Sequence, residues 1–146
     1  MKNQEGKKLI SKEKIISTFD EVAIHIAHKK LIKLNKNEYL YRKNDPIKGI
    51  HYLITGRIKV IQKEKDENYH VLYSIKAPDL IGLSSILYEE YYTNCAYSVE
   101  ESNLIFIPKK DFLNVLNSNK QVAMNLMKLL CVKIGKTEGQ IPQIVP

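Results

Sequence analysis

The chain has very little arginine. It carries a formal net charge of +7 over 146 residues, yet only Arg42 and Arg57 among its 23 basic residues are arginines. Recognition of bases and phosphates depends strongly on the planar guanidinium group. The basic charge therefore indicates a solvated lysine surface that supports at most weak, salt-dependent binding of polyanions.

Long apolar runs and paired cysteines are also missing. No run approaches the roughly 18–20 apolar residues of a membrane span, and no apolar stretch follows the basic N-terminal segment. The two cysteines, Cys95 and Cys131, fit a reducing compartment better than a disulfide framework. We therefore expect a cytoplasmic chain with no membrane partner.

The elements that are present follow a simple order. Residues 11–28 are predicted to be helical, with Ser11 as the cap and apolar residues at helical spacing: Ile15, Phe19, Val22 and Ile26. Residues 29–108 hold eight short β-rich segments between turn signals: KLIKL, EYLYR, GIHYLIT, RIKVIQKE, YHVLYSI, DLIGL, NCAYSV and NLIFIP. This pattern predicts a mainly β fold, an eight-stranded antiparallel β-roll or jelly roll with flanking helices.

Helical periodicity returns over residues 109–140, as a short helix and then a longer one. The longer helix carries more apolar surface than packing on one neighbour requires. We expect part of this surface to pair with a second copy of the chain, through Met124, Met127, Cys131 and Ile134. The alternative is that all of it packs within one chain. Residues 1–146 are predicted to form a single domain.

Two segments resemble the cyclic-nucleotide-binding domain family. In 41–61, YRKNDPIKGIHYLITGRIKVI, the family's Gly-Asp turn corresponds to Asn44–Asp45, its strand tyrosine to Tyr52 and its tight-turn glycine to Gly56. The segment APDLIGLSSIL resembles the start of the family's phosphate-binding cassette, with Asp79 and Gly82 in place.

The remaining elements extend the resemblance over roughly residues 15–140. NLIFIPKKDFLNVL resembles the family's last strand and helix B, and the helix that follows resembles helix C. Within the family, the chain is most similar to the sensor domains of Crp–Fnr-type bacterial transcription regulators. Such regulators continue into a winged helix that reads DNA. No such segment is seen here, so we expect a fragment of a longer regulator, or else a stand-alone module.

The resemblance also shows which ligand groups are missing. Members that bind cyclic nucleotides carry a Glu after the cassette glycine and, about ten residues later, an Arg beside a Ser or Thr. Those positions are Leu83, Thr93 and Asn94 in this chain. A buried phosphate needs a counter-charge or many donors, so the substitutions argue against cAMP as the ligand.

Two interpretations of this segment stay open. In the first, the cassette is degenerate and filled by its own side chains: Leu83, Ile86, Leu87 and Tyr88. In the second, it binds a different, unknown small-molecule effector among apolar and aromatic residues. The helix-opening amides and neighbouring hydroxyls keep some capacity for an anion. The predicted ligand-binding residues are Gly82, Leu83, Ser84, Ser85, Thr93, Asn94, Tyr97 and Thr137.

No pattern indicates an enzyme. A roll of the cupin kind would need clustered histidines, whereas the strand histidines His51 and His70 are isolated. His25 and His28 have a spacing that can ligate a metal, but we see no acidic or cysteine partner that would complete a metal site with them. No cysteine precedes Cys95, which excludes the N-terminal iron–sulfur cluster of some Crp–Fnr relatives. We expect no catalytic site, metal or cofactor.

The resemblance thus implies an effector-binding sensor domain that acts as a homodimer through its long C-terminal helix. DNA binding would come only through a C-terminal domain that this sequence does not show. The alternative is an interaction or dimerisation module with a closed pocket and no ligand.

Overall fold

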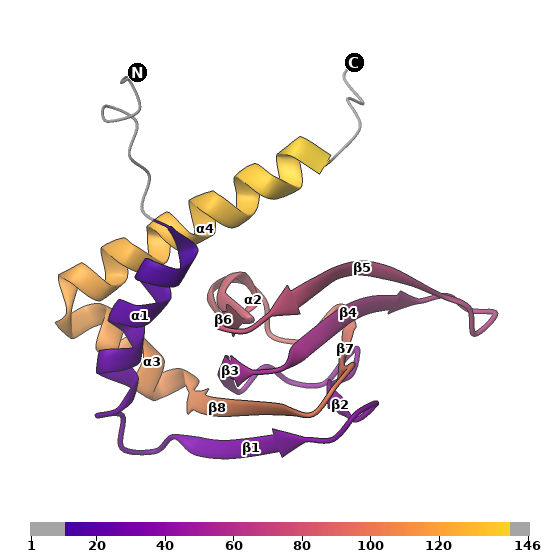
Figure 1. Ribbon diagram of the computed structural model, residues 1–146, viewed down its shortest axis with the longest axis horizontal. Coiled ribbons are helices and arrows are strands. Elements are labelled where there is room, and N and C mark those ends of the chain that lie inside the picture. Colours follow the sequence, from indigo (N-terminus) through magenta and orange to yellow (C-terminus); the bar gives the residue numbers. More distant parts are fainter. Residues whose placement is uncertain (1–10, 141–146) are drawn as a thin grey trace.

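The computed structural model describes the backbone of residues 11–140 and the side chains of residues 11–135. Figure 1 shows a roll of strands with helices at one end. The helices are α1 (Lys12–Ala23), α2 (Leu83–Tyr88), α3 (Lys109–Ser118) and α4 (Lys120–Gln140). The strands are β1 (Lys30–Leu34), β2 (Tyr39–Tyr41), β3 (Gly49–Thr55), β4 (Arg57–Lys63), β5 (Tyr69–Lys76), β6 (Asp79–Ile81), β7 (Cys95–Ser98) and β8 (Ser102–Pro108).

The strands form two four-stranded antiparallel sheets. Their orders are β1-β8-β3-β6 in the first sheet and β2-β7-β4-β5 in the second. Consecutive strands β3 and β4 lie in different sheets, and the turn between them at Gly56 has a positive φ of 107°. The predicted fold class, a mainly β antiparallel roll with flanking helices, is confirmed.

The N-terminal helix is shorter than predicted. The Ser11 hydroxyl caps it by accepting a hydrogen bond from the Lys14 amide at 3.2 Å, as expected. The helix ends at Ala23, and residues up to His28 form turns in place of the predicted helix. Ile26 is nevertheless buried. Its apolar side chain packs in the core from the segment after the helix, so its helical spacing from Val22 does not indicate a helix.

The first sheet separates two apolar cores. On its outer side, α1, α3 and α4 pack against Ile50 and Tyr52 of β3, and we call this cluster the helix-side core. The Phe19 ring meets the Tyr52 ring edge-on, with centroids 6.2 Å apart. On its inner side, between the sheets, lies the roll core: Leu34, Leu53, Ile58, Val60, Ile75, Ile81, Ala96 and Leu104.

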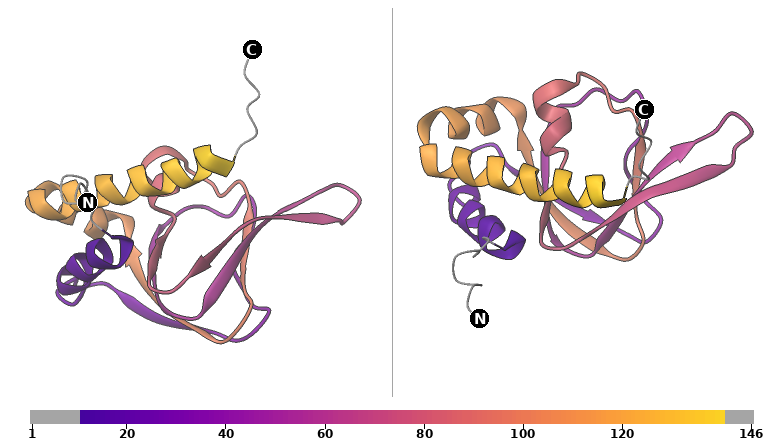
Figure 2. Two further views of the ribbon diagram at one scale, coloured as in Figure 1. Left: turned by 45° about the horizontal axis from the view of Figure 1, so that its top comes forward. Right: turned by 90° about the horizontal axis from the view of Figure 1, so that it is seen from above.

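The long helix α4 runs past α1 and extends toward α2, as the view from above in Figure 2 shows. Its first half is fixed by Val122, Leu126 and Leu129, which are buried in the helix-side core. No helix in residues 11–140 is long and apolar enough to cross a membrane.

Candidate functional site

The predicted cassette begins at a turn that joins β6 to α2. Gly82 caps α2 with a left-handed backbone (φ 91°), and its carbonyl accepts a hydrogen bond from the Ile86 amide at 2.9 Å. A residue without a Cβ adopts this conformation without strain. The cassette glycine therefore occupies the helix-opening turn that the sequence predicted.

A buried carboxylate ties this turn to two helices. Asp79, 5% exposed, lies 3.4 Å from the Lys12 ammonium of α1 and 3.0 Å from the Lys133 ammonium of α4. Lys133 also donates a hydrogen bond to the Leu80 carbonyl at 3.0 Å. The long helix thus contacts the strand that leads directly into Gly82.

Leu83 does not lie where a ligand contact was expected. Its side chain is 3% exposed and belongs to the helix-side core together with Ile86. The side chains of Leu87 and Tyr88 are 52% and 91% exposed, so they do not fill a pocket as the first interpretation required. A two-faced helix explains the difference, because α2 buries the face of Leu83 and Ile86 and leaves its opposite face in solvent.

The other predicted cassette residues are accessible and uncharged. Ser84 and Thr93 are exposed, while Ser85 and Asn94 are half-buried. The side-chain amide of Asn94 donates a 3.4 Å hydrogen bond to the Thr93 hydroxyl. Neither arginine of the chain belongs to this segment, since Arg57 starts β4 and the Arg42 guanidinium lies 3.8 Å from the centroid of the Tyr39 ring.

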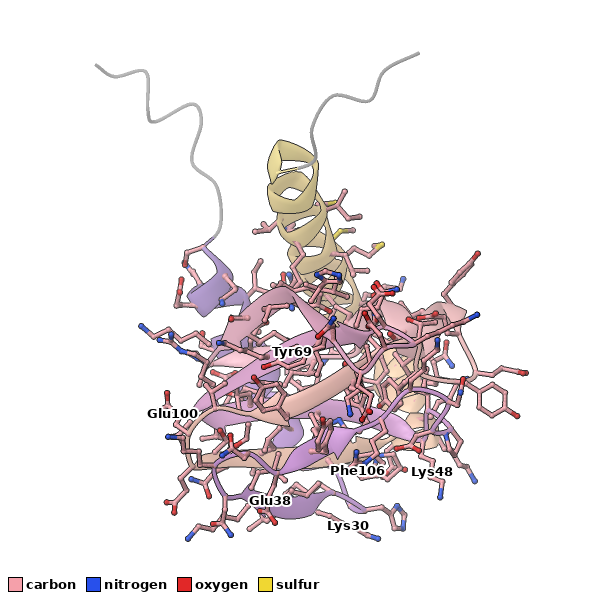
Figure 3. All side chains as sticks on the ribbon, turned by 90° about the vertical axis from the view of Figure 1, so that its right-hand side faces the viewer. Lys30, Glu38, Lys48, Tyr69, Glu100 and Phe106 are labelled. Carbon is pink, nitrogen blue, oxygen red and sulfur yellow. The ribbon has the colours of Figure 1, made fainter. Side chains whose placement is uncertain are left out.

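Tyr97 lies on the other face of its sheet. Its neighbour Ala96 belongs to the roll core, and successive strand residues point to opposite faces. Burial and the neighbouring Tyr69 raise the pKa of Tyr97. Its ring lines an outer hollow of about 370 Å³ with Tyr39, Ile61, Lys63 and Tyr69, near the β4–β5 hairpin. Figure 3, which views the molecule from the right-hand side of Figure 1, labels Tyr69 of this hollow. Tyr97 therefore does not join the other predicted ligand residues.

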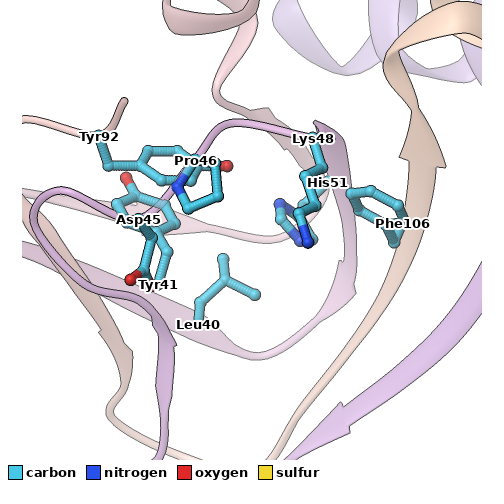
Figure 4. Close-up of a pocket in the computed structure, with 8 residues that line it drawn as sticks. All are labelled: Leu40, Tyr41, Asp45, Pro46, Lys48, His51, Tyr92 and Phe106. Carbon is cyan, nitrogen blue, oxygen red and sulfur yellow. The ribbon is translucent and has the colours of Figure 1, made fainter. Parts of the chain in front are cut away.

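A cavity that the sequence did not indicate opens into the roll beside the predicted cassette. It has a volume of about 270 Å³, and Figure 4 shows its lining. The lining residues come from β2, β3, β8, the turn after β2 and the loop before β7: Leu40, Tyr41, Asp45, Pro46, Lys48, His51, Tyr92 and Phe106.

Aromatic rings form much of the cavity wall. The rings of Tyr41 and Tyr92 are stacked, with centroids 3.7 Å apart and planes 6° apart. Burial and then Asp45 raise the pKa of Tyr92 to about 12, and burial is also the main cause of the raised pKa of Tyr41. Both phenols are therefore neutral at pH 7.

His51 is the buried titratable group of the cavity. Its side chain contacts Phe106, with ring centroids 5.2 Å apart, and the residue is 7% exposed. Its Nδ1 atom has no hydrogen-bond partner among the described residues. Burial lowers the pKa of His51 to about 4, so the imidazole is neutral at pH 7. The signal in the sequence was the position of His51 within the apolar segment GIHYLIT. The first five residues of that strand are all buried.

The residues predicted for the dimer seam lie along one exposed part of α4. Met124, Met127 and Ile134 are 48%, 52% and 53% exposed, and Cys131 is also exposed. They are accessible to a partner chain, as the prediction requires. The side chain of Thr137, the predicted ligand contact on α4, lies outside the described residues.

Within residues 11–135, no group of three or more His, Cys, Asp or Glu side chains is arranged to hold a metal ion.

The expectation that His28 has no acidic partner was wrong. His28 has an acidic neighbour, because its Nδ1 lies 3.0 Å from Asp111 of α3. The partner was missed because it is 83 residues away in the sequence. A single exposed carboxylate–imidazole pair is a surface contact and not a metal site.

Sequence comparison identifies relatives that are much longer than this chain. Lysophospholipase NTE1 of Cryptococcus neoformans is 23% identical over 128 residues, which cover 87% of this chain but 8% of that protein. Lysophospholipase nte1 of Neurospora crassa is 19% identical over 103 residues, 70% of this chain and 7% of that protein. The chain thus spans less than a tenth of these curated relatives.

Solved structures with a similar fold include bacterial regulators. The sensor domain of the transcriptional regulator DNR from Pseudomonas aeruginosa has a TM-score of 0.67 at 21% identity, over 83% of this chain and 81% of that one. The Thermus thermophilus catabolite activator protein has a TM-score of 0.69 at 18% identity, over 82% and 56%. The c-di-GMP responsive regulator CLP of Xanthomonas campestris has a TM-score of 0.71 at 16% identity, over 81% and 58%.

These structural likenesses show a shared fold, and the family itself is established by sequence. The family described as the cyclic nucleotide-binding domain matches residues 31–119, from β1 to the residue after α3. That match includes the cassette turn, the aromatic cavity and both sheets. Because it covers more than half of the 146 residues, the chain belongs to the cyclic nucleotide-binding domain family.

Proposed function

We propose that this chain is the effector-binding sensor domain of a Crp–Fnr-type transcription regulator whose cassette does not respond to cAMP. The family match and the fold shared with regulator sensor domains support the sensor role. The observation that carries the second half of the proposal is the state of the cassette. Leu83 is buried in the helix-side core at the position of the expected carboxylate, and Thr93 stands at that of the guanidinium.

The energetic cost of these replacements argues against a cyclic phosphate as the ligand. Removing one partner of a buried charge pair costs about 3–5 kcal/mol, which corresponds to about two to three and a half decades in affinity. The surviving donors are the amides of the α2 N-terminus and the uncharged side chains of Ser84, Ser85, Thr93 and Asn94. Hydrogen bonds from neutral groups are roughly half as strong as charge-assisted ones. An effector without a phosphate fits this set better.

The signal would pass from the roll to α4. Asp79 stands three residues before Gly82 and pairs with Lys133 of α4 at 3.0 Å. An effector that shifts the β6–α2 turn therefore alters the packing of this helix, with a bias set by its different affinity for the two states. In a cytoplasmic homodimer paired through α4, that bias would be transmitted to a DNA-reading domain elsewhere in the regulator. The proposal assigns no catalytic role to this chain.

Thermal-shift titration with cAMP and cGMP up to millimolar concentration tests the ligand. We expect no change in melting temperature for the wild type, because stabilisation requires a ligand concentration near its Kd. The variant Thr93→Arg supplies a guanidinium in the cassette and should gain a cAMP-dependent rise. Thr55→Arg, at an exposed threonine of β3, is the matched control and should not. A saturable rise of the wild type at micromolar cAMP would refute the proposal.

A second candidate, an interaction module with a closed pocket, is favoured by the exposed apolar residues of α4. Sedimentation measures the pairing that both candidates share. We expect a dimer for the wild type and a monomer for Met127→Glu, because a carboxylate in a paired seam loses its hydration. Leu31→Glu, at a residue of β1 that is 78% exposed, should leave the dimer intact. A monomeric wild type would remove the proposed α4 pairing and this second candidate together.

A further inference from the structure

The cavity at the edge of the roll, open to solvent beside Asp45, Pro46 and Lys48, combines three features of a small-molecule site. It has a volume of about 270 Å³, apolar and aromatic walls and a buried polar atom without a partner. Its walls are Leu40, Pro46 and the rings of Tyr41, Tyr92 and Phe106. Ligand pockets typically consist of such walls with a few polar groups that fix orientation. This cavity is separate from the exposed Ser84 and Thr93 hydroxyls.

His51 supplies the polar group. In Figure 4 its imidazole lies between Phe106 on one side and Leu40 and Tyr41 on the other. A buried polar atom left unpaired is unfavourable, and such atoms in native proteins normally have a partner. A neutral imidazole can donate from one ring nitrogen and accept at the other. A hydroxyl can take either role, so it would suit the imidazole in either tautomer.

The charges around the cavity favour an uncharged ligand. Asp45 and Lys48 carry opposite signs and are exposed, so they provide no net counter-charge inside. The imidazole of His51 is neutral at pH 7 and cannot balance a phosphate or carboxylate. A charge placed among the aromatic walls would lack a partner and would cost several kcal/mol, so this part of the cavity favours an uncharged group.

The size of the cavity sets the size of the ligand. An apolar cavity of about 150 Å³ is large enough to bind benzene. The present volume of about 270 Å³ therefore accommodates one or two fused rings with a small substituent. Flat rings also suit a wall of aromatic side chains, which prefer stacked or edge-on partners.

The geometry points to a binding site for an uncharged aromatic compound of one or two rings that bears a hydroxyl or N–H group. Its ring would lie among Tyr41, Tyr92 and Phe106, and its polar group would pair with the His51 imidazole. This inference rests on the proposed sensor function, since it names the chemical class of the effector and places it in this cavity.

The backbone connects the cavity to the cassette loop. The Tyr92 amide donates to the Asp45 carbonyl at 2.9 Å, and the Asn44 amide donates to the Tyr92 carbonyl at 2.8 Å. Thr93 follows directly. A ligand that displaces the Tyr92 ring therefore acts on the turn after β2 and on the loop before β7.

The test uses 4-methylphenol and 1,4-dimethylbenzene, which have nearly the same shape and differ in the hydroxyl. Each is titrated into the isotope-labelled full chain at pH 7 while the NMR signals of His51, Tyr92 and Phe106 are followed. We expect saturable shifts at these residues, with 4-methylphenol binding about tenfold more tightly because it alone can pair with His51. Melting with cAMP, measured on the same sample, tests the proposed function separately.

Three variants locate the binding. Phe106→Trp fills the cavity and should abolish binding of both probes. His51→Leu keeps the volume but removes the nitrogen, so both probes should bind within about twofold of each other. Leu72→Ala, at an exposed residue of β5 outside the cavity, is the control and should leave both affinities unchanged. If the cavity variants fail to fold, the comparison of the two probes on the wild type decides alone.

Two results would overturn the inference. The first is equal binding of both probes, or no shift at the cavity residues. The second is a set of shifts centred on residues 82–88 that disappears in Ser84→Ala, which would place the ligand in the cassette and leave the sensor role standing. A cAMP-induced rise in melting temperature would refute the proposed ligand preference without deciding whether the cavity binds aromatic compounds.

Discussion

The two sheets have four strands each but very different surroundings. In the first sheet, residues Gly49–Leu53 of β3 are all buried, because helices cover one face and the roll core covers the other. In the second sheet, β4 alternates at its start and the first six residues of β5 are exposed. The comparison shows that the helices give the first sheet its second apolar face.

This difference also separates the functions of the sheets. The first sheet carries Asp79, which contacts α1 and α4, and His51, which lines the cavity. The second carries the hairpin and most of the solvent-facing aromatic residues of the strands, among them Tyr69 and Tyr73 at 53% exposure each. Changes in the first sheet should therefore be felt by the helices, and changes in the second largely should not.

The largest expected effect is the difference in stability loss between two leucine substitutions, one in each sheet. Leu53 of β3 is 0% exposed, so Leu53→Ala should lower the free energy of unfolding by about 2–5 kcal/mol through lost burial and a cavity. Leu72 of β5 is 42% exposed, and Leu72→Ala should change it by no more than about 0.5 kcal/mol. Urea unfolding of both variants measures the contrast. Similar losses would mean that the two sheets are equally covered.

The next effect concerns pH and the inner face of the first sheet. Burial lowers the pKa of His51 from 6.5 to about 4, so the unfolded chain binds a proton in this range that the folded chain does not. His51 therefore does not make the free energy of unfolding depend on pH above about pH 6.5. As the pH falls from there to 4, His51 lowers the free energy of unfolding by about 3 kcal/mol in total. His51→Leu should lack this part of the pH dependence.

Urea unfolding of the wild type and His51→Leu between pH 7 and pH 4 measures that difference. Carboxylates titrate in the same range, but they are common to both proteins and cancel in the comparison. Parallel stability curves for the two proteins would show that His51 is not held neutral by the fold.

Alanine substitutions at two glycines with positive φ should lower stability by smaller and unequal amounts. At Gly56, between the sheets, an added Cβ would overlap the Ser102 side chain, so Gly56→Ala should cost about 2–3 kcal/mol. At Gly82 (φ 91°) an added Cβ meets no described atom within 4 Å, so Gly82→Ala should cost about 1 kcal/mol from backbone strain alone. Thermal unfolding compares them. The reverse order would contradict the role given to the inter-sheet turn.

The smallest expected effect tests the contact of the first sheet with α4. Lys133→Met removes the ion pair to Asp79 and the hydrogen bond to the Leu80 carbonyl, at a cost of about 1 kcal/mol because the side chain is 32% exposed. Lys128→Met, at an exposed residue of α4, is the matched control. Hydrogen exchange should rise at residues 79–83 only in the first variant. Equal exchange in both would remove this contact from the proposed signal path.

Much of the fold could be predicted because its segments carry local signals. The bounds of β1 and β3 match the predicted segments KLIKL and GIHYLIT. The resemblance placed Asn44 where the family has glycine, and its φ of 74° fits, since asparagine tolerates left-handed backbone better than most residues. Local chain geometry explains these successes.

The site was harder to predict because it depends on which face a side chain takes. Leu83 was assigned to the ligand by alignment and Tyr97 as an aromatic residue of the pocket, but Leu83 is buried under the helices and Tyr97 faces outward. His51 was considered only as a metal ligand, and its isolation in the sequence hid its contact with Phe106, 55 residues away. Contacts between residues far apart in the sequence determine which way these side chains point, and a local sequence pattern contains no information about such contacts.

The β4–β5 hairpin has a practical consequence for measurement. Its tip projects beyond the rest of the roll in Figures 1 and 2, and residues 62–70 are all exposed. The turn is closed by its own hydrogen bonds, such as the one from the Glu64 amide to the Asn68 carbonyl at 2.7 Å. Exposed loop tips of this kind tolerate inserted sequence. A circularly permuted fluorescent protein inserted between Lys65 and Asp66 would turn this domain into an optical reporter for screening effectors in living cells.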